Sequence, residues 1–170
     1  MNDQIFTMLR RTKFEIYCWC FLVGKYQRYE KNINIYLALA SSSSIAAWTI
    51  WVKLNWLWAI IITVSQVLTV IKPIFPYFKY AAVLNDKSRE LKVLNIEVEE
   101  LWHKTKDEEI TEEEASNAYF DLQRKINDIN HFETDIDSKV DEKTKEKAKE
   151  ELKKFFKNDY NYDLKDDDLD

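Results

Sequence analysis

Two uncharged apolar stretches, INIYLALASSSSIAAWTIW at residues 33–51 and LNWLWAIIITVSQVLTVI at residues 54–71, decide the predicted fold. As an α-helix, each stretch reaches roughly the thickness of the hydrocarbon core of a bilayer. Only Val52 and Lys53 separate them, so the two helices must run antiparallel. The sequence therefore predicts a transmembrane hairpin with both chain ends on the same side of a membrane.

Charge divides the chain near Lys92. Residues 1–92 carry a net charge of +7 and residues 93–170 a net charge of −12, within an overall charge of −5. Lys and Arg cluster before the first stretch and after the second, whereas the loop between them offers only Lys53. Because positive charges near membrane ends stay in the cytoplasm, both termini are predicted to be cytoplasmic in a multi-pass membrane protein.

The predicted fold class is an all-α membrane protein in four parts. Residues 1–32 form an interfacial amphipathic helix, 33–72 the hairpin, 73–157 a cytosolic helical bundle or coiled coil, and 158–170 a flexible acidic tail. Within the third part, Thr111 and Glu114 form a capping box that starts a helix. A heptad pattern ahead of it runs through Tyr77, Tyr80, Leu84, Lys87, Leu91, Leu94, Val98 and Leu101.

No catalytic motif is present, and a single glycine leaves little material for a phosphate-binding loop. Cys18 and Cys20 are interpreted as reduced thiols, and His103 and His131 are the only histidines that could complete a metal site with them. The chain is therefore predicted not to be an enzyme and to bind neither a cofactor nor a metal ion.

Polar residues inside the two apolar stretches have two interpretations. They either allow close packing between helices or line a polar pore built from several copies of the chain. The candidate pore-lining residues are Ser41, Ser44, Thr63, Gln66 and Thr69, and Pro73 and Pro76 are the candidate gating hinge.

Basic residues near the N-terminus also have two interpretations. They either contact anionic lipid headgroups or bind an anionic nucleotide or single-stranded nucleic acid, whose bases would stack on neighbouring tyrosines. The residues concerned are Arg10, Arg11, Lys25, Arg28 and Lys31.

The segment YLALASSSSIAAW, its basic aromatic lead-in, the minimal loop and the long helix that follows resemble the SLATT family of two-transmembrane effectors over about residues 5–130. The resemblance implies a membrane effector of a bacterial anti-phage, abortive-infection system located in the inner membrane. It also implies a nucleotide or oligonucleotide signal made by a partner nucleotidyltransferase.

The leading hypothesis is therefore a homo-oligomeric gated pore or ion channel, for which a tetramer is a plausible size, with membrane lipid around it. Two alternatives stay open. One is a membrane-anchored scaffold that recruits a protein partner through its cytosolic helices. The other is a holin-like lesion former, although the long C-terminal region exceeds what such a protein needs.

Overall fold

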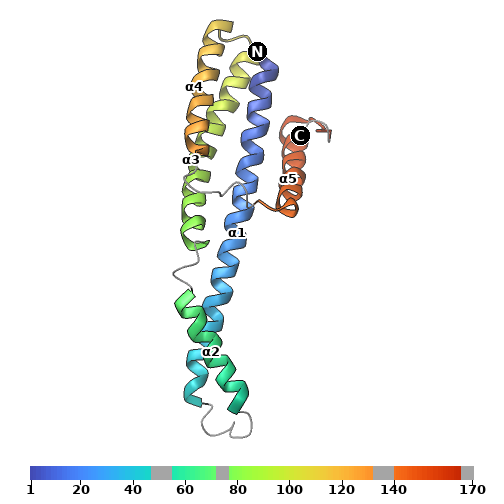
Figure 1. The fold of residues 1–170 in the computed structure, drawn as a ribbon. Helices are drawn as coiled ribbons and strands as arrows, with labels where there is room; N and C mark the ends of the chain where they lie inside the picture. Colours follow the sequence, from blue (N-terminus) through green and yellow to red (C-terminus); the bar gives the residue numbers. More distant parts are fainter. Residues whose placement is uncertain (47–54, 72–76, 132–139, 166–170) are drawn as a thin grey trace. The chain divides into compact units, whose positions relative to one another are not determined.

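The computed structural model describes residues 1–46, 55–71, 77–131 and 140–165, and every regular element in these ranges is an α-helix. The helices are α1 (Asn2–Ala46), α2 (Asn55–Ile71), α3 (Tyr77–Lys106), α4 (Glu112–Asn130) and α5 (Glu142–Tyr160) (Figure 1). The chain divides into two compact units. Unit 1 contains residues 1–23 and 82–170, and unit 2 contains residues 24–81.

The predicted membrane-protein class is not supported. No helix in the described part of the chain is long and apolar enough to cross a membrane. α2 has 17 residues, which gives about 26 Å, less than the roughly 30 Å of a hydrocarbon core. The predicted end of the first apolar stretch, at residues 47–51, lies outside the described residues. The predicted multi-pass inner-membrane location is overturned by the same finding.

The separate N-terminal helix predicted for residues 1–32 is also wrong, because α1 continues without a break to Ala46. Its first half is a core helix and not an interfacial one. Buried side chains recur at alternating spacings of four and three residues, the heptad pattern of a helix that packs against others. They are Ile5, Leu9, Thr12, Ile16, Trp19 and Val23.

Gly24, the only glycine in the chain, lies within α1 at the first residue of unit 2. A Cβ atom added there would meet no heavy atom within 4 Å. Close packing therefore does not require glycine at this position. Glycine in a helix interior costs about 1 kcal/mol relative to alanine.

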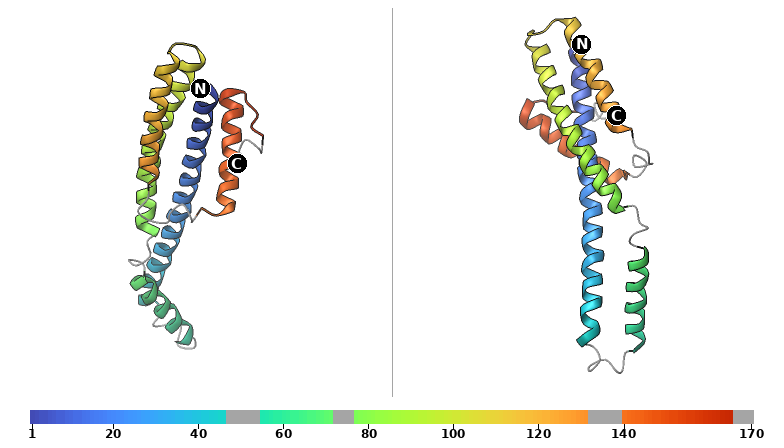
Figure 2. Two further views of the ribbon diagram at one scale, coloured as in Figure 1. Left: turned by 45° about the horizontal axis from the view of Figure 1, so that its top comes forward. Right: turned by 90° about the vertical axis from the view of Figure 1, so that its left-hand side faces the viewer.

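The heptad predicted for α3 is largely confirmed. Leu84, Leu91 and Val98 are fully buried, and Leu94 and Leu101 are nearly so. Lys87 departs from the pattern, because its ammonium group donates to the carbonyl oxygens of Ile129 and His131 at 2.7 and 3.0 Å. Ser88 lies in the core beside it. In unit 1, α3 and α4 run alongside the first half of α1 (Figure 2).

The predicted capping box at the start of α4 is confirmed. The backbone N–H of Glu114 donates to Thr111 Oγ1 at 3.3 Å, and the backbone N–H of Thr111 donates to Glu114 Oε2 at 2.9 Å. The backbone N–H of Thr111 and its hydroxyl group, which also donates to Glu114 Oε2 at 2.8 Å, lower the pKa of Glu114. The box fixes the residue at which α4 begins.

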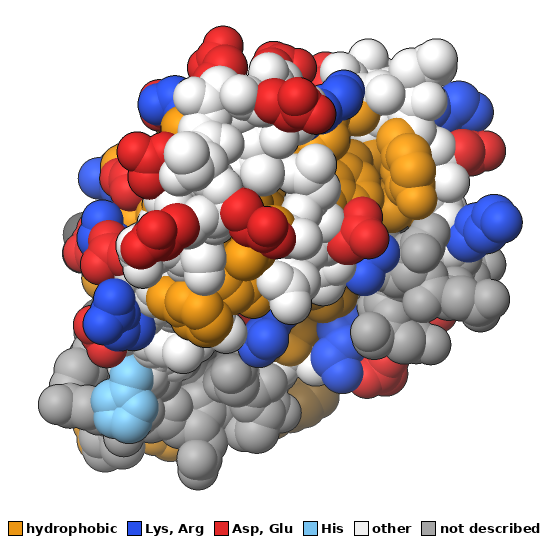
Figure 3. All heavy atoms as spheres, turned by 90° about the horizontal axis from the view of Figure 1, so that it is seen from above, with side chains coloured by type: hydrophobic (Ala, Val, Ile, Leu, Met, Phe, Trp, Pro, Cys, Tyr) orange, Lys and Arg blue, Asp and Glu red, His pale blue; other side chains and the backbone are white. Residues whose placement is uncertain are grey.

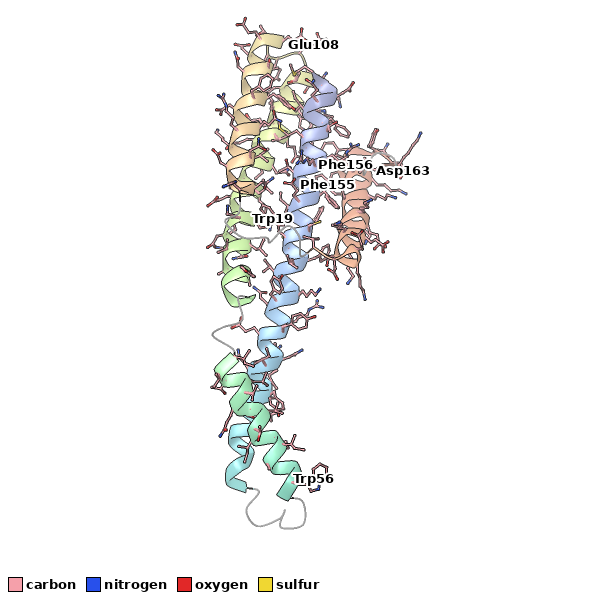
Figure 4. The ribbon with its side chains drawn as sticks, viewed as in Figure 1. Trp19, Trp56, Glu108, Phe155, Phe156 and Asp163 are labelled. Atoms are coloured by element: carbon pink, nitrogen blue, oxygen red, sulfur yellow. The ribbon has the colours of Figure 1, made fainter. Side chains whose placement is uncertain are left out.

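An aromatic cluster attaches α5 to the rest of unit 1. The ring of Phe156 is fully buried and lies 5.3 Å from each of the rings of Phe6, Phe155 and Tyr160, measured between centroids (Figure 4). Trp102 of α3 joins through Phe6 at 5.7 Å. Edge-to-face and tilted contacts of this kind add stability beyond the apolar area that they bury.

Asn158 to Tyr160, which the prediction assigned to a flexible acidic tail, belong to α5. α5 continues to Tyr160, and Asn161 then takes a left-handed conformation with a φ of 50°. The N–H of Tyr162 donates back to the carbonyl of Phe156 at 3.0 Å, which closes the helix end, and Leu164 is buried. Residues 158–164 are therefore part of unit 1, and 166–170 lie outside the described residues.

Candidate functional site

The candidate pore-lining residues are only partly visible. The side chains of Ser41 and Ser44 lie outside the described ones, as do both candidate hinge residues, Pro73 and Pro76. Thr63, Gln66 and Thr69 are exposed on α2 at a spacing of three residues, so they share one stripe of the helix. Whether that stripe lines a pore stays a prediction.

The hydroxyl groups of α2 are satisfied within the helix. Thr63, Ser65 and Thr69 each donate to the carbonyl oxygen four residues earlier, at 2.7 to 2.8 Å. A hydroxyl group that donates to its own helix in this way does not need a hydrogen-bond acceptor on a neighbouring helix. The Gln66 side chain is different, because its amide carries both donors and an acceptor at an exposed position.

The remainder of α2 is apolar on every side. The helix contains no ionisable residue, and none of its described side chains is buried. Ile61, Ser65 and Leu68 form a half-buried edge. Six large apolar side chains are exposed around the rest of the helix, beginning with Trp56 at its N-terminal end (Figure 4); the others are Ile60, Ile62, Val64, Val67 and Val70. An uncharged helix that exposes this many large apolar side chains is normally covered by something else.

The predicted anion-binding residues do not form a single group. Arg10 and Arg11 belong to unit 1, and Lys25, Arg28 and Lys31 belong to unit 2. Arg11 also has a local partner, since its Nε donates to Glu15 Oε1 at 3.2 Å. The prediction that these residues bind an anion is not tested by their placement.

A groove between α1 and α4, within unit 1, is the best-defined concave site in the described part of the chain. Its volume is about 300 Å³. Met8 and Ile126 supply apolar lining, whereas Asp3, Arg11, Glu15 and Asn130 supply polar groups. Acidic side chains are also prominent on the end of the molecule seen from above (Figure 3). The groove combines an apolar surface with charged and amide groups, as ligand sites in proteins do.

Glu15 organises the polar wall of this groove. Its Oε1 accepts the hydrogen bond from Arg11, and its Oε2 accepts one from Asn130 Nδ2 at 2.8 Å. The second bond fixes the orientation of the Asn130 amide, because a flipped amide would place its oxygen against a carboxylate oxygen. Asn130 Oδ1 is then buried and accepts no hydrogen bond from the described residues.

The sequence predicted Arg11 as an anion-binding residue, not as part of this groove, and it predicted no role for Glu15 or Asn130. These two residues are 115 positions apart, and neither belongs to a motif. The available signal was the face of α1 on which Asp3, Arg11 and Glu15 lie at helical spacings of eight and four residues. That face had been considered only for its positive charges.

A second cluster of titratable groups lies where α5 meets α1 and α3. Lys13 Nζ stands 3.8 Å from the centre of the Phe155 ring, and burial lowers the pKa of Lys13 although Glu99 and Asp159 oppose the shift. The hydroxyl of Tyr160 donates to Glu99, and burial together with this carboxylate raises the pKa of Tyr160. These contacts fasten α5 in place.

Comparison of the chain with models of known protein families, with curated proteins and with solved structures finds no match in any of the three. The resemblance to the SLATT family therefore stays a prediction.

Proposed function

We propose that this protein is a self-assembling helical scaffold, in which α2 joins several copies of the chain and unit 1 of each copy presents binding surfaces. The observation that carries the proposal is the character of α2: it has no ionisable residue and no buried one among its described side chains. Burying apolar surface contributes roughly 25 cal/mol per Å², so leaving this helix uncovered is unfavourable.

Two properties of α2 favour a second copy of the same chain as its cover. When identical charged helices pack together, like charges come close and repel each other. α2 has no charged residue, so this repulsion does not arise between two copies of it. Gln66 adds a self-complementary group, because a primary amide can donate to and accept from the same amide on another copy. A single buried amide of this kind can also select one oligomer size.

The gated pore, its nucleotide signal and its role in anti-phage defence stay predictions. A pore needs membrane-crossing helices, and the described helices do not include one. The scaffold needs only that copies of α2 pack together, so it is the function proposed for this chain.

The test is the mass of the full chain in sedimentation equilibrium, with and without Val67→Glu. Val67 lies on an exposed stripe with Ile60 and Val64. The unaltered chain is expected at a multiple of 20.4 kDa, and Val67→Glu at 20.4 kDa, because a carboxylate buried between apolar helices is strongly unfavourable.

Val93→Glu is the matched control. Val93 is 58% exposed on α3 in unit 1, compared with 48% for Val67, so the same substitution there should leave the assembly intact. The proposal is overturned if the unaltered chain is monomeric. If this monomeric chain floats with phosphatidylcholine vesicles and Val67→Glu abolishes flotation, lipid and not a second copy covers α2.

A further inference from the structure

A second row of side chains recurs along α3, on the side away from Leu84, Leu91 and Val98, which lie in the core of unit 1. Its members are spaced alternately four and three residues apart, which is the heptad spacing of a helix that packs against another helix. Every member is exposed, so the packing of unit 1 leaves this row uncovered. We call it the α3 seam; it consists of Ala82, Asp86, Arg89, Val93, Ile96, Glu100 and His103.

The centre of the α3 seam is apolar. Val93 and Ile96 are 58% and 65% exposed and lie on adjacent turns of the helix, so they form one small patch. The seam has charged or polar side chains on both sides of this patch. Covering the patch removes apolar surface from water and is favourable.

The charges of the α3 seam make it complementary to itself. Arg89 and Glu100 lie equally far from the midpoint of the apolar patch, on opposite sides of it, and so do Asp86 and His103. When a second α3 is laid antiparallel about this midpoint, the patch faces itself, Arg89 faces Glu100 and Asp86 faces His103. Each of these pairs occurs twice, because such a contact has twofold symmetry. A parallel copy would place each charge opposite its own kind, so the charge order favours the antiparallel direction.

The groups that meet across this contact are available for it. The guanidinium of Arg89 has no hydrogen-bond or ion-pair partner among the described residues. Lys104 bonds only Oε1 of Glu100, which leaves Oε2 to accept from a guanidinium of the second copy. The imidazole of His103 carries an N–H donor whether or not it is protonated, and the carboxylate of Asp86 accepts.

The contact is too small to join two free chains. Each copy contributes two large apolar side chains, whereas stable complexes bury roughly 800 Å² on each partner. Ion pairs between exposed side chains add little. Copies that are already joined elsewhere meet at an effective concentration on the order of millimolar, at which a weak contact forms.

We propose that α3 of one copy packs antiparallel on α3 of a second copy through this seam, within the assembly that α2 holds together. This inference rests on the function proposed above. The α3 contact adds no mass, because it forms between copies that are already joined. Val93→Glu should therefore leave the mass of the assembly unchanged, as expected above, and remove the α3 contact.

The experiment is disulfide cross-linking of the full chain that carries both Asp86→Cys and His103→Cys. These two positions face each other in the antiparallel pair, so oxidation should link two chains into a covalent dimer. The two single-cysteine chains are controls, because position 86 of one copy then lies about 25 Å along the helix from position 86 of the other. The unaltered chain reports any cross-linking through the native Cys18 and Cys20.

The double-cysteine chain should give at least about fivefold more covalent dimer than either single-cysteine chain, since a disulfide forms only between closely placed Cβ atoms. The proposal is overturned if the single-cysteine chains cross-link equally well, because a parallel contact or random collision would then explain the result. An assembled chain without the cross-link overturns this proposal alone. A monomeric unaltered chain in sedimentation overturns both this proposal and the proposed function.

Charge reversal in the double-cysteine chain tests the assigned pairs. Arg89→Glu should lower the yield of covalent dimer about fivefold or more, because it places a carboxylate opposite Glu100 in both halves of the contact. Adding Glu100→Arg restores opposite charges and should restore the yield. Arg124→Glu is the matched control, because the Arg124 side chain is 76% exposed on α4 and lies outside the seam. Equal yields from the Arg89→Glu and Arg124→Glu chains, or no recovery with Glu100→Arg, contradict the proposed pairing.

Discussion

Replacing Phe156 by alanine should destabilise unit 1 more than any single change on its surface. The ring is fully buried and contacts Phe6, Phe155 and Tyr160, each at 5.3 Å between centroids. Removing a buried phenylalanine costs about 3–5 kcal/mol. The lost ring pairs place this site toward the upper end of that range, at about 5 kcal/mol. That is a large fraction of the roughly 5–15 kcal/mol that stabilises a typical domain.

The assay is urea unfolding of the full chain, followed by far-UV circular dichroism. Phe120→Ala is the matched control, because Phe120 is 55% exposed on α4, and its loss should change the free energy of unfolding by less than about 0.5 kcal/mol. The reasoning is refuted if Phe156→Ala costs less than about 1 kcal/mol, or if the two variants lose equal stability.

Three further changes test single contacts. The pKa values of Tyr17 and Tyr160 are raised, so the folded state holds these protons more tightly than the unfolded state does. Their contribution to the free energy of unfolding is therefore present below about pH 10 and is lost above it. Tyr160→Phe should flatten the alkaline loss of stability, measured by urea unfolding between pH 9 and about 11. An unchanged slope would exclude Tyr160 as a cause. Thr111→Ala should cost about 1 kcal/mol in thermal unfolding through loss of the α4 cap, whereas Thr111→Ser should cost little; equal loss in both would contradict the capping role. Lys87→Met should speed amide exchange in the last turn of α4, where its ammonium holds two carbonyl groups, and unchanged exchange would show that the helix end holds without it.

Local signals in the sequence predicted the C-terminal helices well. The heptad of α3 and the capping box of α4 depend on residues three to seven positions apart, and such spacings follow directly from helix geometry. The prediction erred at Lys87, where a long side chain reaches the end of α4 and leaves the core position to Ser88.

The membrane class was predicted from the hydropathy and length of the two apolar stretches and from the distribution of positive charges, but no described helix is long and apolar enough to cross a membrane. The described helix of the second stretch, α2, has 17 residues, fewer than the roughly 20 that a membrane span usually needs. The heptad in α1 was missed because Thr12 and the aromatic Trp19 occupy core positions among basic neighbours. The hydrogen bond from Asn130 to Glu15 joins distant segments, and one sequence gives no local sign of it.

α1 is one helix of 45 residues, in which backbone hydrogen bonds connect each turn to the next. Gly24 is the one residue along it with no side chain to restrict the backbone, and it occurs where unit 1 gives way to unit 2 in the chain. The backbone of α1 is therefore least restricted by side chains at Gly24. Gly24→Ala would restrict the backbone at this residue without displacing any neighbouring atom. A change in the behaviour of α1 in this variant would therefore come from its backbone and not from its packing.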